Sequence, residues 1–142
     1  MKQETLDGIL RAAWQSVSKM YNKEAQKFSS TMATGFALLS IAPEGTPSTT
    51  LGPKMGIEAT SLSRLLKTME AKELIYRQPN PADGRSVLIC LTPFGVKKRE
   101  DSKAVVLKFN ETLRNQIAPQ KIQTFLEVSQ HIMNTAQNFT YY

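Results

Sequence analysis

Two short β-prone runs stand close together in a chain whose other segments are patterned as helices. The first run is LIYRQ, residues 74–78, and the second is SVLICL, residues 86–91. Between them, residues 79–85 contain two prolines and an Asp-Gly pair. An Asp-Gly pair between two β-prone runs is a hairpin signal. We therefore predict a β-hairpin whose tip is formed by residues 79–85.

The rest of the chain has the apolar periodicity of helices, in which apolar residues recur at spacings of three and four. Prolines and glycines punctuate this pattern. Thr46-Pro47 has the sequence of an N-cap followed by proline in the first helical turn, and Gly56 is a plausible helix stop. Thr92-Pro93 repeats the cap-then-proline pattern. The predicted helices cover residues 5–28, 31–41, 47–55, 58–72, 93–117 and a last segment after Pro119.

Residues 58–72 form the most regular of these helices. Leu62, Leu65, Leu66 and Met69 make one apolar stripe along it. The polar side chains that fall largely outside the stripe are Thr60, Ser61, Ser63, Arg64, Lys67 and Thr68. Short helices, a polar-faced helix and a hairpin, in that order, are typical of a winged helix-turn-helix module. The predicted fold is thus mainly α with a small β-hairpin wing, flanked by N- and C-terminal helices.

The net charge of +6 is concentrated in the middle of the chain. Residues 48–99 hold nine Lys/Arg against four Asp/Glu, a net charge of +5. The segment before them has a net charge of +1 and the segment after them a net charge of zero. Such a concentration favours a polyanion as partner. An anionic membrane fits less well, because the basic residues do not line an apolar-faced helix.

Residues 58–72 have the two faces that a helix in the DNA major groove needs. The guanidinium of Arg64 can donate bidentate hydrogen bonds to guanine, and the hydroxyls of Thr60, Ser61 and Ser63 can reach phosphates or bases. The alternative is an ordinary amphipathic surface helix. The neighbouring hairpin and the charge distribution favour the DNA-binding interpretation.

Arg85, at the hairpin tip, is a candidate minor-groove contact, because the minor groove is narrow and strongly negative in A/T tracts. We expect Gly84 to allow a tight turn and Asp83 to hold the Arg85 guanidinium by a charge-assisted bond. The alternative is a surface ion pair on a mobile loop, which contributes little to stability.

The segment from Thr31 to Gly95 resembles the MarR family of bacterial transcription regulators. The resemblance rests on the short helix opened by Thr46-Pro47, then TSLSRLLKTMEAKELIYR (60–77), DGRS (83–86) and LTPFG (91–95), in this order and at fitting spacing. It implies that Arg77, at the entry to the wing, is also a DNA-binding residue. It further implies one domain over residues 1–142, with an N-terminal dimerisation helix (1–30), the winged module (31–92) and C-terminal dimerisation helices (93–142).

The resemblance implies a homodimer whose terminal helices interlock. A twofold dimer would bind a pseudo-palindromic operator with half-sites about 34–36 Å apart. The family also implies a ligand-responsive repressor with a small apolar effector of phenolic, lipid-like or acyl type. Trp14, Tyr21, Phe28 and Phe36 are candidates for lining the effector pocket. A winged-helix protein-interaction module without DNA binding remains the alternative.

Two positions depart from the family pattern. Glu73 stands where glycine usually ends the recognition helix with a positive φ, so a strained residue or a different turn is expected. Gly52-Pro53 lies inside the helix at 47–55, where the family usually has Leu-Ala. Proline beyond the first turn removes a hydrogen bond, so we expect this helix to be bent or divided.

Several other classes of function are not expected. No nucleophile–base pair, phosphate loop or ligand-spaced metal cluster is visible, so neither an enzyme nor a cofactor is predicted. The single histidine, His131, fits a surface or interface position, and the single cysteine, Cys90, fits a buried inert thiol better than a redox sensor. The sequence contains no apolar run long enough to span a bilayer, and residues 1–14 do not resemble a signal peptide, so a cytoplasmic protein is expected.

Overall fold

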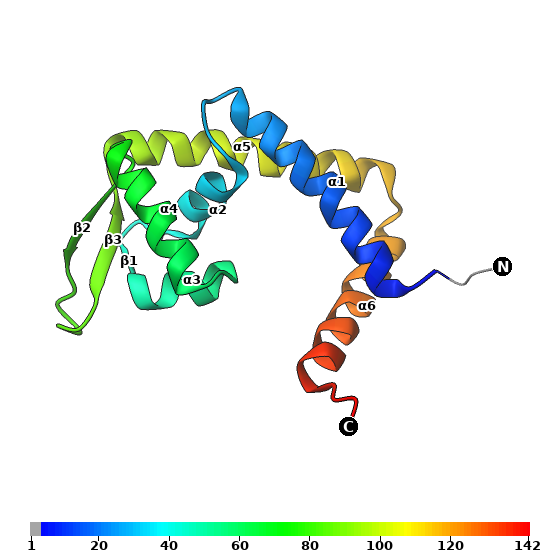
Figure 1. Cartoon of the computed structure of the whole chain (residues 1–142). Coiled ribbons are helices and arrows are strands. Elements are labelled where there is room, and N and C mark those ends of the chain that lie inside the picture. Colours follow the sequence, from blue (N-terminus) through cyan, green and yellow to red (C-terminus); the bar gives the residue numbers. More distant parts are fainter. Residues whose placement is uncertain (1–3) are drawn as a thin grey trace. The chain divides into compact units, whose positions relative to one another are not determined.

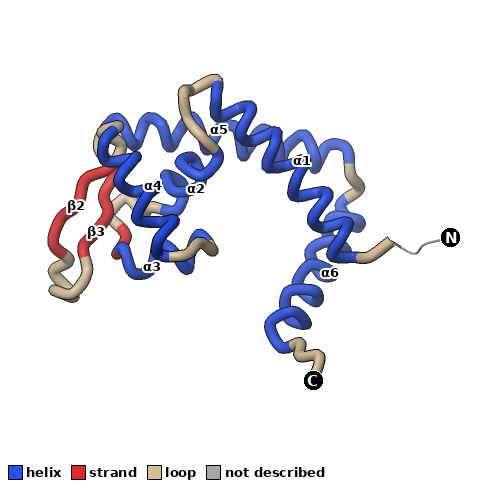
Figure 2. The backbone as a smooth tube through the Cα atoms, viewed as in Figure 1, coloured by secondary structure: helices blue, strands red, loops and turns tan. Residues whose placement is uncertain are grey.

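The computed structural model describes residues 4–142 and is mainly helical, with one small antiparallel sheet (Figures 1 and 2). It confirms the fold class expected from the sequence. The chain divides into two compact units at Val105 and Val106, inside the fifth helix. The elements are α1 (Leu6–Gln26), α2 (Met32–Ser40), β1 (Thr46–Pro47), α3 (Ser48–Met55), α4 (Ala59–Ala71), β2 (Ile75–Pro79), β3 (Val87–Leu91), α5 (Pro93–Gln116) and α6 (Pro119–Asn138).

The predicted hairpin is confirmed as β2 and β3, which project beside α4 with the connecting loop at their far end (Figure 1). In this hairpin Ile75 pairs with Leu91, and Pro79 pairs with Val87. A third strand, β1, adds to the outer side of β3 and gives the order β1-β3-β2. We call β2, β3 and the loop between them the wing.

The N-cap expected at Thr46 is wrong. Thr46 and Pro47 pair with β3 instead, with Thr46 opposite Ile89. The Thr46 hydroxyl oxygen accepts a hydrogen bond from the Ala42 N–H at 2.8 Å. Helix α3 therefore begins at Ser48, and Pro47 at its N-cap position makes no side-chain capping bond.

The core of the N-terminal unit lies between α2, α3, α4 and the sheet. The apolar stripe of α4 faces this core, with Leu62, Leu66 and Met69 buried. It packs with Ala37, Leu38, Ile41, Leu51, Leu74, Ile75 and Ile89 in one cluster. Because burial fixes the rotation of α4 about its axis, the polar side of the helix must face outward.

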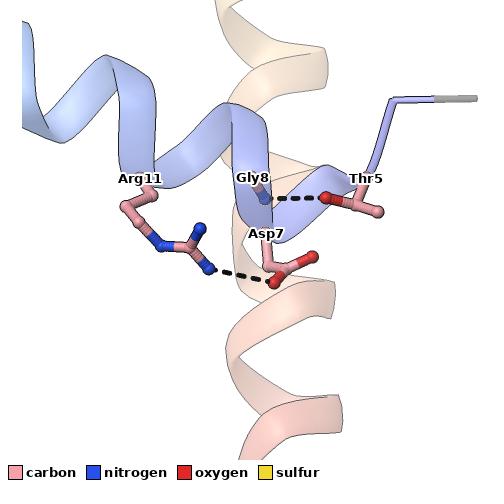
Figure 3. A network of polar contacts seen from close by, with 4 residues as sticks. All are labelled: Thr5, Asp7, Gly8 and Arg11. Carbon is pink, nitrogen blue, oxygen red and sulfur yellow. Dashed lines mark hydrogen bonds and ion pairs between the residues drawn. The ribbon is translucent and has the colours of Figure 1, made fainter.

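Side-chain caps begin two of the long helices. The hydroxyl oxygen of Thr5 accepts the Gly8 N–H at 3.2 Å, and Asp7 in the same turn pairs with Arg11 at 3.4 Å (Figure 3). At the start of α5, the Thr92 hydroxyl oxygen accepts the Gly95 N–H at 2.9 Å. These bonds satisfy N–H groups that have no partner inside the helix. The capping role predicted for Thr92 is thereby confirmed.

The two departures from the family pattern have different outcomes. Glu73 has a φ of 61°, so the expected left-handed residue is present without glycine. Helix α3 is continuous through Pro53, so the division considered for this helix does not occur. It ends at Gly56, which has a φ of 71° and confirms the predicted stop.

Helices α1 and α6 contain no buried residue among those described. Each nevertheless carries large apolar side chains, including Leu6 and Trp14 on α1 and Phe125 and Phe139 on α6. Across residues 4–142, no helix combines the length and the apolar character needed to cross a membrane.

Candidate nucleic-acid interface

The outer face of α4 is polar from Thr60 to Thr68 and carries two cationic side chains. The side chains predicted to contact DNA from this helix are all exposed, namely Thr60, Ser61, Ser63, Arg64, Lys67 and Thr68. The Thr68 hydroxyl donates to the Arg64 carbonyl oxygen at 3.1 Å, one turn back on the helix. The remaining hydroxyls and the two cationic groups point away from the core and can bind an external partner.

The loop of the wing is shaped by short bonds between side chains and backbone. The Asn80 side-chain oxygen accepts the Ala82 N–H at 3.0 Å, and its amide nitrogen donates to the Ser86 hydroxyl at 2.9 Å. The Asp83 carboxylate accepts the Arg85 N–H at 3.0 Å. These bonds define the path of the backbone that carries Arg85 to the tip.

The role expected for Asp83 therefore needs correction. Its carboxylate binds the backbone N–H of Arg85 and not the guanidinium. Within the described part of the chain, the exposed Arg85 side chain forms no ion pair. The chain turns at Gly84, where the Ser86 N–H donates to the Asp83 carbonyl oxygen at 3.2 Å. This turn does not require glycine, because a side chain there would meet no atom within 4 Å and φ is not positive. Asp83 orders the loop, and the Arg85 guanidinium stays available.

Arg77 occupies the first strand of the wing, and an acid from α4 holds it. Its Nε donates to the Glu70 carboxylate oxygen Oε1 at 3.1 Å. The two side chains are partly exposed, 35% for Arg77 and 42% for Glu70. The structure thus joins α4 to the wing through a residue, Glu70, that the sequence reasoning left out.

Three of the four aromatic residues proposed for an effector pocket lie together. The Phe36 ring lies 6.3 Å from Trp14 and 5.7 Å from Tyr21, measured between ring centroids. Burial raises the pKa of the Tyr21 hydroxyl above its ordinary value. Trp14 is 51% exposed, so this cluster is open on one side.

The fourth aromatic residue, Phe28, lines a separate cavity of about 330 Å³. Its other walls include Phe94 and Leu74, together with the side chains of Lys72 and Lys98. The Lys98 ammonium donates to the Phe28 carbonyl oxygen at 3.3 Å and stands 5.6 Å from the centre of the Phe94 ring. Sequence reasoning missed these lysines because they come from two segments that only the fold brings together.

The residues considered for metal or redox chemistry are not grouped into a site. In the described residues, no three His, Cys, Asp or Glu side chains lie together as metal ligands could. Cys90 is buried, as expected, with 5% exposure. His131 is exposed on α6.

Residues 31–87 match the model of the MarR family. Two curated relatives from Bacillus subtilis (strain 168) are uncharacterized HTH-type transcriptional regulators. YxaD is 33% identical over 86 residues, which are 61% of this chain and 59% of that protein. YdgJ is 26% identical over 88 residues, which are 62% of this chain and 54% of that protein. The chain thus spans less than two thirds of the length of either relative.

Solved structures with the same fold include complexes with DNA. The Staphylococcus aureus MepR–DNA complex aligns with a TM-score of 0.84 at 20% identity, covering 94% of this chain and 99% of that chain. A mutant of E. coli MarR complexed with operator DNA aligns with a TM-score of 0.79 at 22% identity, covering 89% and 92%. At these identities the likeness shows the winged helix-turn-helix fold.

Proposed function

We propose that the chain is a transcription regulator of the MarR family that binds operator DNA, because residues 31–87 match the model of that family. Members of this family are transcriptional regulators and not enzymes. In the proposed complex, α4 enters the major groove and Arg85 of the wing enters the adjacent minor groove. The DNA complexes of MepR and E. coli MarR support this proposal through their shared fold.

One observation carries the proposal. The polar and cationic side chains of α4 and the unpaired Arg85 are exposed on neighbouring elements of one compact unit. The segment that contains them, residues 48–99, holds nearly all the net positive charge. Side chains of this kind can make both kinds of DNA contact. Cations bind the phosphates, and bidentate donors form hydrogen bonds with base edges.

The proposal includes a homodimer. The exposed apolar side chains of α1 and α6 would cost free energy in water, so a second copy of the chain would cover them. Phe125 is 61% exposed and Leu6 is 68% exposed, and both exposed fractions are far above those of the core residues. A twofold dimer would place two α4 helices on successive major grooves and would select a pseudo-palindromic operator.

The proposal also includes an effector, in keeping with a ligand-responsive repressor. The cavity of about 330 Å³ falls in the range of small-molecule sites. Its aromatic and aliphatic walls favour a phenolic or acyl body, and Lys72 and Lys98 favour a negative group on that body. An effector that binds better to the DNA-free conformation would release the operator.

The direct test measures binding of the intact chain to duplex DNA from the region upstream of its own gene. Affinity for the duplex should fall steeply as salt rises, because each phosphate contact releases counterions. Arg85→Ala should weaken operator binding about tenfold. Arg114→Ala is the matched control, since it removes the same charge from the segment with no net charge.

The outcomes separate the possibilities. Unchanged binding by Arg85→Ala would show that the wing does not contact DNA. No salt-dependent binding to any duplex would favour the protein-interaction module without DNA binding.

A further inference from the structure

Glu70 is an acid on the face of the molecule that we propose binds a polyanion. It lies in the last turn of α4, within the segment of net charge +5. By charge alone, a carboxylate near the DNA backbone opposes binding. A specific favourable contact is therefore needed to offset the repulsion between the Glu70 carboxylate and the DNA phosphates.

That contact is the hydrogen bond and ion pair with Arg77 across the junction of α4 and the wing. The Arg77 Nε lies 3.1 Å from Glu70 Oε1. The other ion pairs among residues 4–142 join residues at most four apart along the chain. The Glu70–Arg77 pair joins two different elements, so it fixes the position of a wing cation relative to the recognition helix.

Among the described residues, Glu70 is the one that binds the Arg77 guanidinium. The contact runs from Nε to Glu70 Oε1, and no other described residue makes a hydrogen bond or ion pair with this guanidinium. Because the guanidinium is planar and rigid, holding Nε also sets the direction of the remaining N–H groups. Arg77 borders a hollow of about 260 Å³ on the wing, together with Asn80 and Ser86.

We infer that Glu70 is a positioning residue, which holds Arg77 so that its terminal amino groups bind a DNA phosphate between the major-groove and minor-groove contacts. This inference rests on the proposed function. A partly exposed ion pair contributes little to folding stability, so its loss leaves the fold intact. The pair therefore acts on the geometry of binding.

The test asks whether removing the Glu70 carboxylate raises or lowers the affinity for DNA. Removing an acid from a DNA-facing surface strengthens binding if only charge matters. Removing the residue that positions Arg77 weakens binding to operator and unrelated duplex alike, because phosphate contacts carry no sequence information. Glu70→Ala should thus lower both affinities about tenfold and reduce the slope of log affinity against log salt by about 0.9.

Glu58→Ala is the matched control. Glu58 is exposed at the other end of α4, and its side chain makes no capping bond to the helix. This variant loses the same charge from the N-cap position of the same helix, and its affinity should rise. Glu70→Gln keeps an oxygen that can accept from Arg77 Nε, so it should restore most of the affinity lost in Glu70→Ala.

A double-mutant cycle completes the experiment. Arg77→Lys keeps the charge but lacks Nε, and it should weaken binding as Glu70→Ala does. The double variant should be no weaker than Arg77→Lys alone, because both changes remove the same contact. Thermal melting followed by circular dichroism should be the same for all variants.

The inference is overturned if Glu70→Ala binds both duplexes at least as tightly as the unaltered chain, with the same salt slope. If the unaltered chain binds no duplex, the proposed function itself fails and the inference falls with it. The two failures are distinguished by the unaltered chain alone.

Discussion

Glu73 adopts a backbone conformation that glycine adopts without strain. Its φ of 61° ends α4, and the following Leu74 N–H donates to the Met69 carbonyl oxygen at 2.9 Å. The Glu73 carbonyl oxygen accepts the Thr92 hydroxyl at 2.6 Å. The fold thus holds a left-handed glutamate at the point where α4, the wing and α5 meet. Such residues cost on the order of 1–2 kcal/mol relative to an unstrained conformation.

Glu73→Gly should therefore stabilise the chain. We expect the free energy of unfolding to rise by about 0.5–1 kcal/mol, since relief of strain exceeds the extra entropy of glycine in the unfolded chain. Urea denaturation at one fixed protein concentration measures it. Lys72→Gly is the control, because Lys72 has a φ of −87° and gains nothing from glycine. A lower stability for Glu73→Gly would contradict the strain assigned to this residue.

Arg77 and Arg85 show what the sequence could predict about single side chains. The outward direction of the polar residues on α4 followed from the apolar stripe alone, because one buried face fixes the other. The partner of Arg77 did not follow, because Glu70 lies seven residues away on a different element. Asp83 was predicted to act on Arg85, but the local loop geometry brings its carboxylate to the backbone N–H.

The elements were largely predictable where the signal was local. The hairpin and the long helices were found within a few residues of their ends, since the apolar period and the Thr92 cap are properties of short segments. Strand β1 was missed for the opposite reason. Thr46-Pro47 has the local sequence of a helix start, but pairing with β3 decides its structure. Tertiary hydrogen bonds overrode the local pattern.

Helices α1 and α6 carry the apolar surface that the proposed dimer would bury. On α6, Phe125 is 61% exposed and Met133 is 49% exposed. No residue of α6 is buried, although the helix runs for 20 residues. An amphipathic helix of this length gains most of its stability from packing, so a covering partner is expected.

Phe125→Asp should shift the chain from dimer to monomer, because a buried unpaired carboxylate strongly opposes association. Sedimentation velocity over a range of concentrations measures this shift. Asn134→Asp is the control, since it adds the same charge nine residues along the helix, on the opposite side. A Phe125→Asp variant that remains as dimeric as the unaltered chain would remove α6 from the interface.

The N-terminal unit contains both the proposed DNA-binding face and the cavity beside Phe28. Lys72 follows the last residue of α4 and also lines this cavity. A ligand there would contact the end of α4 directly. By linkage, a ligand that weakens DNA binding must itself bind less tightly to the DNA complex.

Lys98→Met should test the charge of that ligand. We expect this variant to bind small aromatic or acyl carboxylates about tenfold more weakly, because a half-buried ion pair is lost. The corresponding neutral amides should bind the unaltered chain and the Lys98→Met variant with equal affinity. Isothermal titration calorimetry measures the affinities, and Lys103→Met, an exposed lysine on the same helix, is the control. If the affinities for carboxylates and for amides fall equally, Lys98 acts through packing and not through its charge.

We propose that a twofold dimer of this chain binds DNA through α4 and the wing. A cleavage-protection footprint on the region upstream of its gene tests this most directly. We predict protection of an inverted repeat with half-site centres about one helical turn apart, roughly 34–36 Å. Protection should be lost in Arg64→Ala and retained in Arg114→Ala. Absence of protection at protein concentrations that saturate non-specific binding, or protection of a single site without an inverted repeat, would contradict the account.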